Sequence, residues 1–552
     1  MKFFKKAFAV TIAAALSCIC FAACGQNGGG EEETVYYTVQ FDVNGGTMSQ
    51  DRTVKVKEGE SVTLPEAQRE GHTLDGWYHG EALAGVAGAT YLPESDVTLK
   101  AEWTETVDHG AVNMERAVEY AKLIQKEYWN AQSKVSKLTP QGGVPFLWPY
   151  TEQVSMVNGI LLNMEKTDPE YAAFSNYLEE LIIGLRYYRV SEVRVGTGQS
   201  WNNPDHYLAA FGQTDGTANA YAIYNSGKNE NNIVDNHSVG MSGVYFDDNI
   251  WVAKEFYYAY VNLGKVEYLN EAVNIVNWII GEGYESTKNL NGIYWKWSAK
   301  FMFEGSGGLS DETHASLNAC SSAPTAMMLA KLHQTLKSDD HAAKFSALAT
   351  DYLSKAQKIY EFCHGVLINT SNGCLRDKIF LREGFQNMNN LNDQIQMYDE
   401  QILPYNTGTY MTAGAELYKI AVAAKQTAVA KVYKDRNEKV APAADKQFAN
   451  TQVVQGQYSY NSNSWFTSFI LEGFIDLSET VDCTAYIEHM RSALDYAWNN
   501  NRAEDKLVCP AWIAGWGEFH DNGISEQNPR QILLQAANAH CYAMLARYYS
   551  AK

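Results

Sequence analysis

Apolar residues recur with a helical period from Ala111 to the end of the chain, and this pattern constrains the fold more than any other feature. From Phe174 to Tyr188 they stand at positions i, i+4, i+7, i+11 and i+14, which form one continuous stripe on a helix. The pattern predicts about a dozen helices, many in closely connected pairs. They include Asn113–Trp129, Thr151–Glu165, Tyr171–Tyr188, Asn249–Leu263, Glu267–Ile280, Asn318–Leu336, Ala342–Cys363, Thr409–Ala424, Trp465–Leu477, Ala485–Trp498 and Gln531–Tyr549.

Helical hairpins in this number form either an open solenoid or a closed ring. A solenoid repeats consensus residues at a fixed period, and the sequence shows no such repeat. Two long stretches, Val190–Tyr245 and Gly365–Asn406, interrupt the helix pairs as irregular segments. Long loops in a compact domain usually carry function. We therefore expect an all-α fold, a closed α/α toroid with these loops around one mouth.

A period of two governs the segment before the helices. Tyr37–Val43 alternates apolar and polar residues, and Asn44-Gly45-Gly46 is typical of a hairpin turn. Further short runs of the same kind continue to Trp103. Because the period changes abruptly near residues 103–113, we expect a small β module that folds independently of the helical body.

The motifs of this module follow a known order. FDVNGG from Phe41, then G-x-x-x-x-GW, then V-T-L-x-A-x-W ending at Trp103 resemble the Listeria–Bacteroides repeat of the internalin B type. The resemblance implies a β-grasp-like module over residues 36–104. Modules of this type serve exported proteins as spacers or adhesion modules. The resemblance implies that the module contacts a cell wall or a glycan, and it assigns no catalytic residue to the module.

The first residues predict export. Lysines precede the apolar stretch Ala7–Ile19, which is too short to span a bilayer permanently. Small residues then precede Cys24, which resembles a bacterial lipobox. The resemblance implies removal of residues 1–23 and a lipid on Cys24, which would attach the chain to the membrane at the cell surface. An ordinary secretory signal is the alternative. Residues 24–35 are rich in Gly and Glu and predict a flexible tether.

Charge and cysteine content exclude other classes of protein. The formal net charge of −20 argues against nucleic acid as a partner. The cysteines after the signal show no C-x-x-C spacing and no paired histidines, so we expect neither a metal site nor a cofactor. Cys363 and Cys374 are close enough in sequence to close a short disulfide loop.

The string from Tyr245 to Trp251 is the most informative for chemistry. Its adjacent carboxylates, Asp247 and Asp248, open a predicted helix. Acidic residues there can simply cap the helix and complement its dipole. Hydrolysis of a glycosidic bond, however, requires a protonated acid and a second carboxylate. Neighbouring carboxylates cannot easily both ionise, so the pKa of one is raised. The residues support such a pair and leave the order of the two roles open.

The same string resembles the Y-[YF]-D-D-x-x-W signature of glycoside hydrolase family 76, which comprises endo-α-1,6-mannanases and related enzymes on an (α/α)6 fold. Gly292-Ile-Tyr-Trp295 and Tyr405-Asn406-Thr-Gly408 follow in the family's order, with Thr407 in place of Gln. The resemblance covers residues 111–552. It implies a retaining hydrolase of α-mannosidic linkages, with Asp247 as nucleophile, Asp248 as acid/base and an α-mannan as substrate.

Aromatic and amide side chains are candidates for binding sugar. Trp295 and Trp297 stand two residues apart in a Gly-flanked loop, so we expect their rings to share one face. For each aromatic ring, packing in the core is the competing explanation. The expected substrate-binding residues are Tyr245, Trp251, Trp295, Trp297, Tyr405 and Asn406, with Trp512 and Trp516 as further platforms and His314 and His520 as structural residues.

Two other functions compete with this one. The chain could be a surface lipoprotein that captures glycans without cleaving them, or an (α/α)6 enzyme such as an unsaturated-uronide hydrolase or a polysaccharide lyase. The last two need a different set of acidic, Tyr, His or Arg residues, which the Asp pair disfavours.

Overall fold

The computed structural model describes residues 34–69, 71–189, 192–194, 220–223, 238–240, 243–287, 290–297, 314–450, 457–460, 462–513 and 528–552. The chain divides into two compact units, Met1–Val107 and Asp108–Lys552, each with its own hydrophobic core. None of the helices in the described part combines the length and the low polarity that a membrane span requires.

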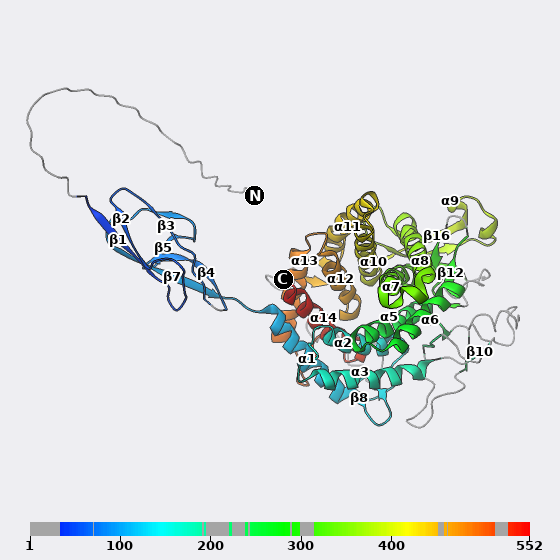
Figure 1. Cartoon of the computed structure of the whole chain (residues 1–552). Coiled ribbons are helices and arrows are strands. Elements are labelled where there is room, and N and C mark those ends of the chain that lie inside the picture. Colours follow the sequence, from blue (N-terminus) through cyan, green and yellow to red (C-terminus); the bar gives the residue numbers. More distant parts are fainter. Residues whose placement is uncertain are drawn as a thin grey trace, which may run out of the picture. The chain divides into compact units, whose positions relative to one another are not determined.

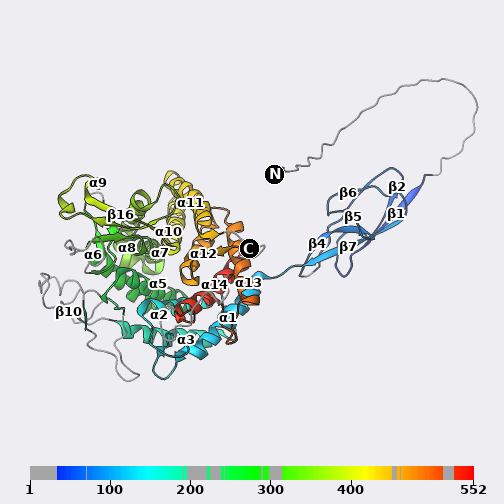
Figure 2. The same cartoon turned by 180° about the vertical axis from the view of Figure 1, so that it is seen from behind.

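The N-terminal unit is a strand-rich module (Figures 1 and 2). Its strands are β1 (Tyr36–Asp42), β2 (Thr53–Lys57), β3 (Val62–Thr63), β4 (His72–His79), β5 (Ala82–Gly85), β6 (Thr90–Tyr91) and β7 (Val97–Glu105). The main sheet has the order β2-β1-β7-β4-β5, and β1 runs parallel to β7. Alternate residues of β1, Val39 and Phe41, are buried against Trp77, whose indole donates a hydrogen bond to the Pro65 carbonyl over 2.8 Å.

The FDVNGG motif makes the turn that follows β1. Asn44 and Gly45 have φ values of 45° and 87°, the left-handed backbone that a tight hairpin turn requires. Gly46 is needed for a different reason, because a Cβ atom there would lie 2.5 Å from the Trp103 ring. Two motifs far apart in sequence therefore pack on each other.

The helical unit is a closed ring in two layers (Figure 1). In the described residues, twelve long helices alternate along the chain between an outer and an inner layer, and each inner helix packs on its two neighbours until the last meets the first. The inner helices are α2 (Leu147–Leu161), α5 (Phe246–Leu263), α7 (Ala319–Lys337), α10 (Pro404–Ala423), α12 (Ser464–Leu477) and α14 (Ile532–Ser550). The outer helices are α1 (His109–Tyr128), α3 (Tyr171–Leu185), α6 (Val266–Gly283), α8 (Asp339–Phe362), α11 (Thr427–Phe448) and α13 (Thr484–Asn500).

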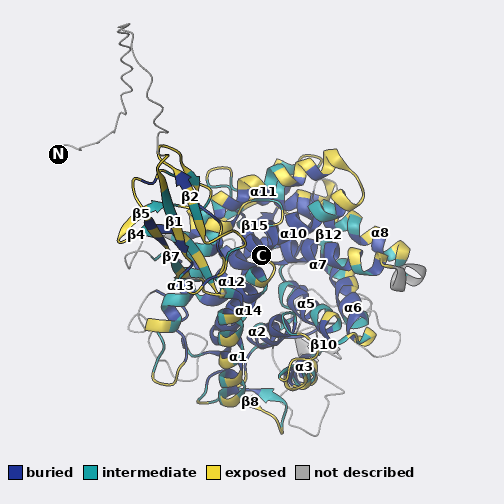
Figure 3. Cartoon of the chain, turned by 60° about the vertical axis from the view of Figure 1, so that its left-hand side comes forward, coloured by how far each residue is buried: buried dark blue, intermediate teal, exposed yellow. Residues whose placement is uncertain are grey.

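Burial distinguishes the two layers (Figure 3). Inner helices such as α2 and α14 are buried on nearly every side, whereas outer helices such as α1 and α6 bury one stripe. A helix that is surrounded by other helices must carry apolar or hydrogen-bonded side chains on all its sides, whereas a surface helix needs only one apolar face. The all-α toroid with a small β module that the sequence predicts is confirmed.

Gly365–Asn406, expected to be irregular, contains two strands. β15 (Arg376–Leu381) pairs antiparallel with β14 (Ser316–Asn318) on one side and β16 (Ile395–Ile402) on the other. Five successive residues of β15 are buried, so the strand has no alternating pattern by which it could be recognised. The remaining short elements are β8 (Trp129–Asn130), β9 (Val135–Ser136), β10 (Glu192–Arg194), β11 (Ser238–Gly240), β12 (Tyr284–Glu285), β13 (Gly292–Ile293), β17 (Ala449–Asn450), β18 (Ser459–Tyr460), α9 (Leu391–Gln394) and the single turns η1 (Arg186–Tyr188), η4 (Cys363–Leu367) and η5 (Phe385–Asn387).

Three local features differ from the sequence analysis or were left open by it. Helix α11 was not predicted, because its buried stripe includes three alanines and an asparagine among many charged residues. Helix α10 begins at Pro404 and not at Thr409, as proline at the first helical position signals. Cys363 and Cys374 are both free thiols, so no disulfide joins them.

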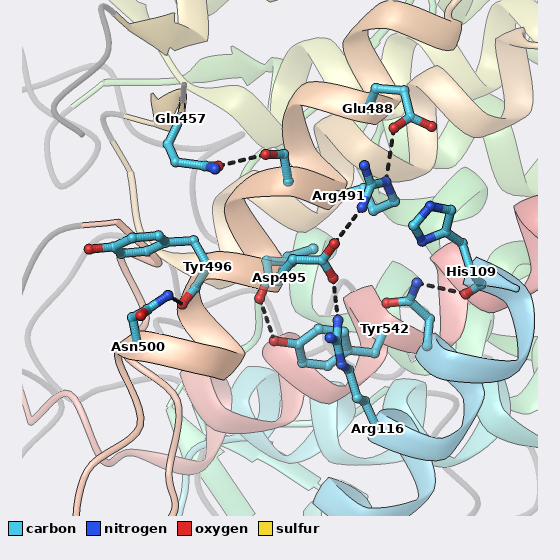
Figure 4. A network of polar contacts seen from close by, with 12 residues as sticks. His109, Arg116, Gln457, Glu488, Arg491, Asp495, Tyr496, Asn500 and Tyr542 are labelled. Atoms are coloured by element: carbon cyan, nitrogen blue, oxygen red, sulfur yellow. Dashed lines mark hydrogen bonds and ion pairs between the residues drawn. The ribbon is translucent and has the colours of Figure 1, made fainter. Parts of the chain in front are cut away.

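The ring is closed where its first helix meets its last two (Figure 4). Arg116 of α1 pairs with Asp495 of α13, which also pairs with Arg491. The guanidinium of Arg116 lies 5.7 Å from the Trp498 ring and 5.9 Å from that of Tyr542 on α14. This network joins residues almost 400 positions apart in the sequence.

Candidate active site

The Asp pair stands at the N-terminus of inner helix α5. Tyr245 is the N-cap residue and has extended backbone. Its segment pairs with the segment of Trp295, because the Phe246 amide donates to the Trp295 carbonyl over 2.8 Å and the Trp297 amide donates to the Val244 carbonyl over 3.1 Å. The pairing brings the Trp295 ring to 4.8 Å from that of Tyr245, edge to face.

Asp247 has several hydrogen-bond donors. The Trp295 indole Nε1 donates to its Oδ2 over 3.1 Å, and the Asp248 amide donates to its Oδ1 over 3.0 Å. Burial raises the pKa of the Asp247 carboxyl to about 6. The donors, which include the Cys320 thiol, oppose this rise because they stabilise the anion.

Asp248 has a different environment. Its pKa is raised well above the usual value, first by burial and then by the negative charge of Asp247. Within the described residues, no hydrogen bond is donated to its carboxylate to offset these effects. The two adjacent side chains therefore differ, and at neutral pH Asp247 is the one that ionises and Asp248 the one that keeps its proton.

Both carboxylates line a cavity of about 340 Å³. Inner helices supply Asp247, Asp248, Cys320 and Tyr405, and the β14–β15 sheet supplies Asn318, Asp377 and Lys378. The remaining lining residues are Phe146, Trp148, Ile223, Tyr245, Trp295 and Leu403. The N-termini of several inner helices thus meet at one polar and aromatic pocket.

Of the expected substrate-binding residues, Tyr245, Trp295 and Tyr405 line this cavity, and three others do not. Trp251 is buried, with its ring 4.9 Å from that of Phe469. Trp297 is also buried and donates to Glu282 over 3.2 Å, so the expectation that it shares a face with Trp295 is corrected.

The third residue outside the cavity is Asn406. It is fully buried and donates to Asp377 Oδ1 over 3.1 Å, so it supports a lining residue without lining the cavity itself. Trp512 is buried as well and donates to Asn538 over 2.8 Å. His314 lies against Phe380, with 6.5 Å between ring centroids. Trp516 and His520 lie outside the described residues.

The sequence analysis did not identify Asp377 and Lys378. Burial raises the pKa of the Asp377 carboxyl, and Lys378, 3.3 Å away, opposes the rise. Both follow Cys374-Leu-Arg, in the stretch that was expected to be irregular. Recognition of β15 would not have placed both side chains in the cavity, because consecutive residues of a regular strand face opposite sides, and the ladder is irregular between Arg376 and Lys378. Among the described residues, no cluster of His, Cys, Asp and Glu could hold a metal ion.

Comparisons with known proteins describe the two units separately. Residues 37–102 match the model of the Listeria–Bacteroides repeat domain. A protein of Evansella cellulosilytica named as a Gly-rich membrane protein is 35% identical over 99 residues, which are 16% of this chain and 11% of that protein. The chain therefore spans only a small part of this relative.

The helical unit resembles solved structures of family 76 glycoside hydrolases. One from a bovine Bacteroides thetaiotaomicron strain has a TM-score of 0.58 and 18% identity, and covers 84% of this chain and 83% of its own. A family 76 mannosidase of B. thetaiotaomicron VPI-5482 has a TM-score of 0.57 and 16% identity, covering 79% and 98%. An α-1,6-mannanase of a Salegentibacter species has a TM-score of 0.52 and 15% identity, covering 79% and 99%. That variant is inactive, carries Asn for two adjacent aspartates and holds α-1,6-mannotriose.

These comparisons define the class. The chain combines a Listeria–Bacteroides repeat with a body that has the (α/α)6 fold of family 76 glycoside hydrolases.

Proposed function

We propose that the helical unit, residues 111–552, is a retaining glycoside hydrolase that cleaves α-mannosidic linkages, with linear α-1,6-mannan as its substrate. The observation that carries this proposal is the Asp247–Asp248 pair, two adjacent carboxylates with unequal partners in an aromatic cavity. A solved protein with the same fold loses activity when two adjacent aspartates become Asn, and it binds α-1,6-mannotriose.

The unequal partners support the division of roles. Asp247, whose anion accepts hydrogen bonds, attacks the anomeric carbon, while Asp248 gives its proton to the departing glycosidic oxygen. The carbon–oxygen bond breaks and a glycosyl ester forms on Asp247. Asp248 then removes a proton from water, which attacks the same carbon and releases the sugar with its original configuration.

The cavity walls suit a neutral sugar. Tyr245, Trp295 and Tyr405 offer ring faces and edges, and Asp377 offers carboxylate oxygens to hydroxyl groups. Asn406 and Trp251 act from behind the wall, Asn406 by holding Asp377 and Trp251 by packing the α5–α12 contact. Trp297 anchors the loop that carries Trp295.

We also propose that the protein works at the bacterial cell surface. Residues 1–23 act as the signal, Cys24 carries the lipid, residues 24–35 form the tether and the 36–104 module contacts the wall or a glycan. Residues 1–33 lie outside the described residues, so the sequence and the repeat domain support this part. Replacement of Cys24 by Ala should move the protein from the membrane fraction to the medium, and an unchanged distribution would refute the anchor.

Proton NMR of the first products from linear α-1,6-mannan tests the activity. A retaining enzyme releases the α-anomer first, and the β-anomer appears only by later mutarotation. Initial release of the β-anomer would refute the nucleophilic role of Asp247. Products with the ultraviolet absorption of an unsaturated sugar, released from a uronic-acid polysaccharide and not from mannan, would identify a lyase, and binding of mannan without cleavage would identify a glycan-capture protein.

A further inference from the structure

A second cavity, of about 630 Å³, lies at the other end of the helical ring. Four helices contribute to both regions: α5, α7, α10 and α12 place their first turns at or beside the Asp pair and later turns at this cavity. On α5, Asp247 and Tyr258 are eleven residues apart, which corresponds to about 16 Å along a helix. The two cavities have no lining residue in common.

All but one of the charged side chains in the second cavity are paired with one another. Lys331 lies 3.2 Å from Glu416, and Lys419 bridges Glu416 at 3.8 Å and Glu479 at 3.1 Å. Arg547 lies 3.5 Å from Asp476 Oδ1. The exception, Lys552, donates to the Thr484 hydroxyl over 3.4 Å. A neutral ligand can bind here without displacing any of these ion pairs.

Two buried polar atoms in this lining have no hydrogen-bond partner among the described residues. They are Asp476 Oδ2, an acceptor, and the Tyr548 hydroxyl, which both donates and accepts. The two residues are only 9% and 5% exposed. Buried polar atoms are nearly always paired in folded proteins, so these two keep hydrogen-bonding capacity for a group that enters the lining.

Aromatic rings complete the lining. Tyr257 and Tyr258, one turn before the end of α5, lie with their rings 5.3 Å apart, edge to face. Lys331 stands 5.9 Å from the Tyr258 ring centroid. A volume of this size accommodates a small ligand. A neutral occupant that is rich in groups able to donate and accept hydrogen bonds, and that can lie against aromatic rings, therefore fits this lining.

We propose that this cavity is a second binding site for a neutral oligosaccharide, separate from the candidate active site. Sugar hydroxyls donate to Asp476 Oδ2 and accept from the Tyr548 hydroxyl, and the ion pairs around them supply further donors and acceptors. A site of this kind holds the glycan chain against the enzyme while the Asp pair acts elsewhere.

The test uses the full chain with Asp247→Asn and Asp248→Asn, which removes turnover, and α-1,6-mannotriose as the probe. Isothermal titration should show two sites. Adding Tyr548→Phe should weaken one of them about tenfold, because the hydroxyl but not the ring is lost. Tyr460→Phe is the matched control, since its hydroxyl is also buried without a partner in the described residues but lies outside both cavities.

Asp476→Asn provides a second variant and should weaken the same site. Trp295→Ala should weaken only the other one. A single site that Tyr548→Phe leaves unchanged, or displacement of mannotriose from the Tyr548-dependent site by inorganic phosphate, would overturn the proposal. Hydrolysis by the parent chain is measured separately, so two binding sites without hydrolysis would count against the proposed function and leave this site standing.

Discussion

The two ends of the inner ring are made by the same helices but surround two of their buried carboxylates, Asp247 and Glu416, with opposite kinds of neighbour. At the N-terminal end, burial raises the pKa of Asp247 and Asp248, and among the described residues hydrogen-bond donors oppose this rise at Asp247 only. At the other end burial also acts to raise the pKa of Glu416, but Lys331 and Lys419 outweigh it and lower the value to about 2.

The difference shows that burial alone does not decide how a carboxyl group behaves. Burial disfavours the anion at both ends, and the neighbours determine the outcome. A group held protonated near neutral pH can act as an acid, whereas a group locked in an ion pair can only hold structure or a ligand. The ring therefore separates the carboxylates of the proposed active site at one end from a cluster of ion pairs at the other.

The largest expected effect is at the Asp pair. Asp247→Asn and Asp248→Asn should each lower kcat by at least about a hundredfold, because the nucleophile or the proton donor is lost. Glu267→Gln is the control, since Glu267 is also an acid in the first turn of a helix, α6. If Asp247 and Asp248 only complemented the helix dipole, all three variants would behave alike, with near-parental turnover.

Both the helical ring and the Asp pair could be predicted from sequence, because each depends on local pattern. The stripe of Phe174 to Tyr188 and the carboxylates at the start of α5 are visible without tertiary contacts. Asp377 and the cavity around Tyr548 could not be predicted, because β15 is buried on both faces and α14 is buried all round. The prediction that Trp297 shares a face with Trp295 was wrong for a related reason. The spacing of two residues gives the direction of their side chains only where the backbone is regular.

A smaller but still large effect is expected from the ion pair at the opposite end. Lys331→Met leaves Glu416 buried without its closest cation, so the helical unit should lose about 3 kcal/mol of stability. Thermal unfolding at pH 7 measures the loss. Lys431→Met breaks an exposed pair on α11, with the lysine 71% exposed, and should leave the unfolding temperature almost unchanged.

The pH dependence of this effect has a defined sign. The folded pKa of Glu416 is depressed to about 2, so its stabilising contribution is present above the unfolded value of about 4.3 and fades as the pH falls toward 2. The difference in melting temperature between the parent and Lys331→Met should therefore narrow over that range. A constant difference would show that Glu416 is not the partner that matters.

A moderate effect is expected from Trp295→Phe, which removes a hydrogen bond to the Asp247 anion. The pKa of Asp247, about 6 in the parent, should rise, so the acidic limb of kcat/KM moves up by about one pH unit. Just below pH 6 the variant should be up to about tenfold slower. Trp297→Phe is the control, because its indole donates to Glu282 outside the cavity, and the limb should stay in place. Equal shifts in both variants would argue against a specific bond.

The smallest effect is expected at the contact between the first helix and the last two, which closes the ring, because this contact supports both ends of the ring equally. Arg116→Met keeps a long side chain beside Trp498 but removes the charge that pairs with Asp495. Asp495 retains Arg491, so the loss should be only about 1 kcal/mol. The melting temperature should fall by about 1 to 2 °C, while the pH profile and mannotriose binding stay unchanged. A shift of the pH profile or a loss of mannotriose binding would show that closure of the ring controls the geometry of the end concerned. The two ends would then not be independent.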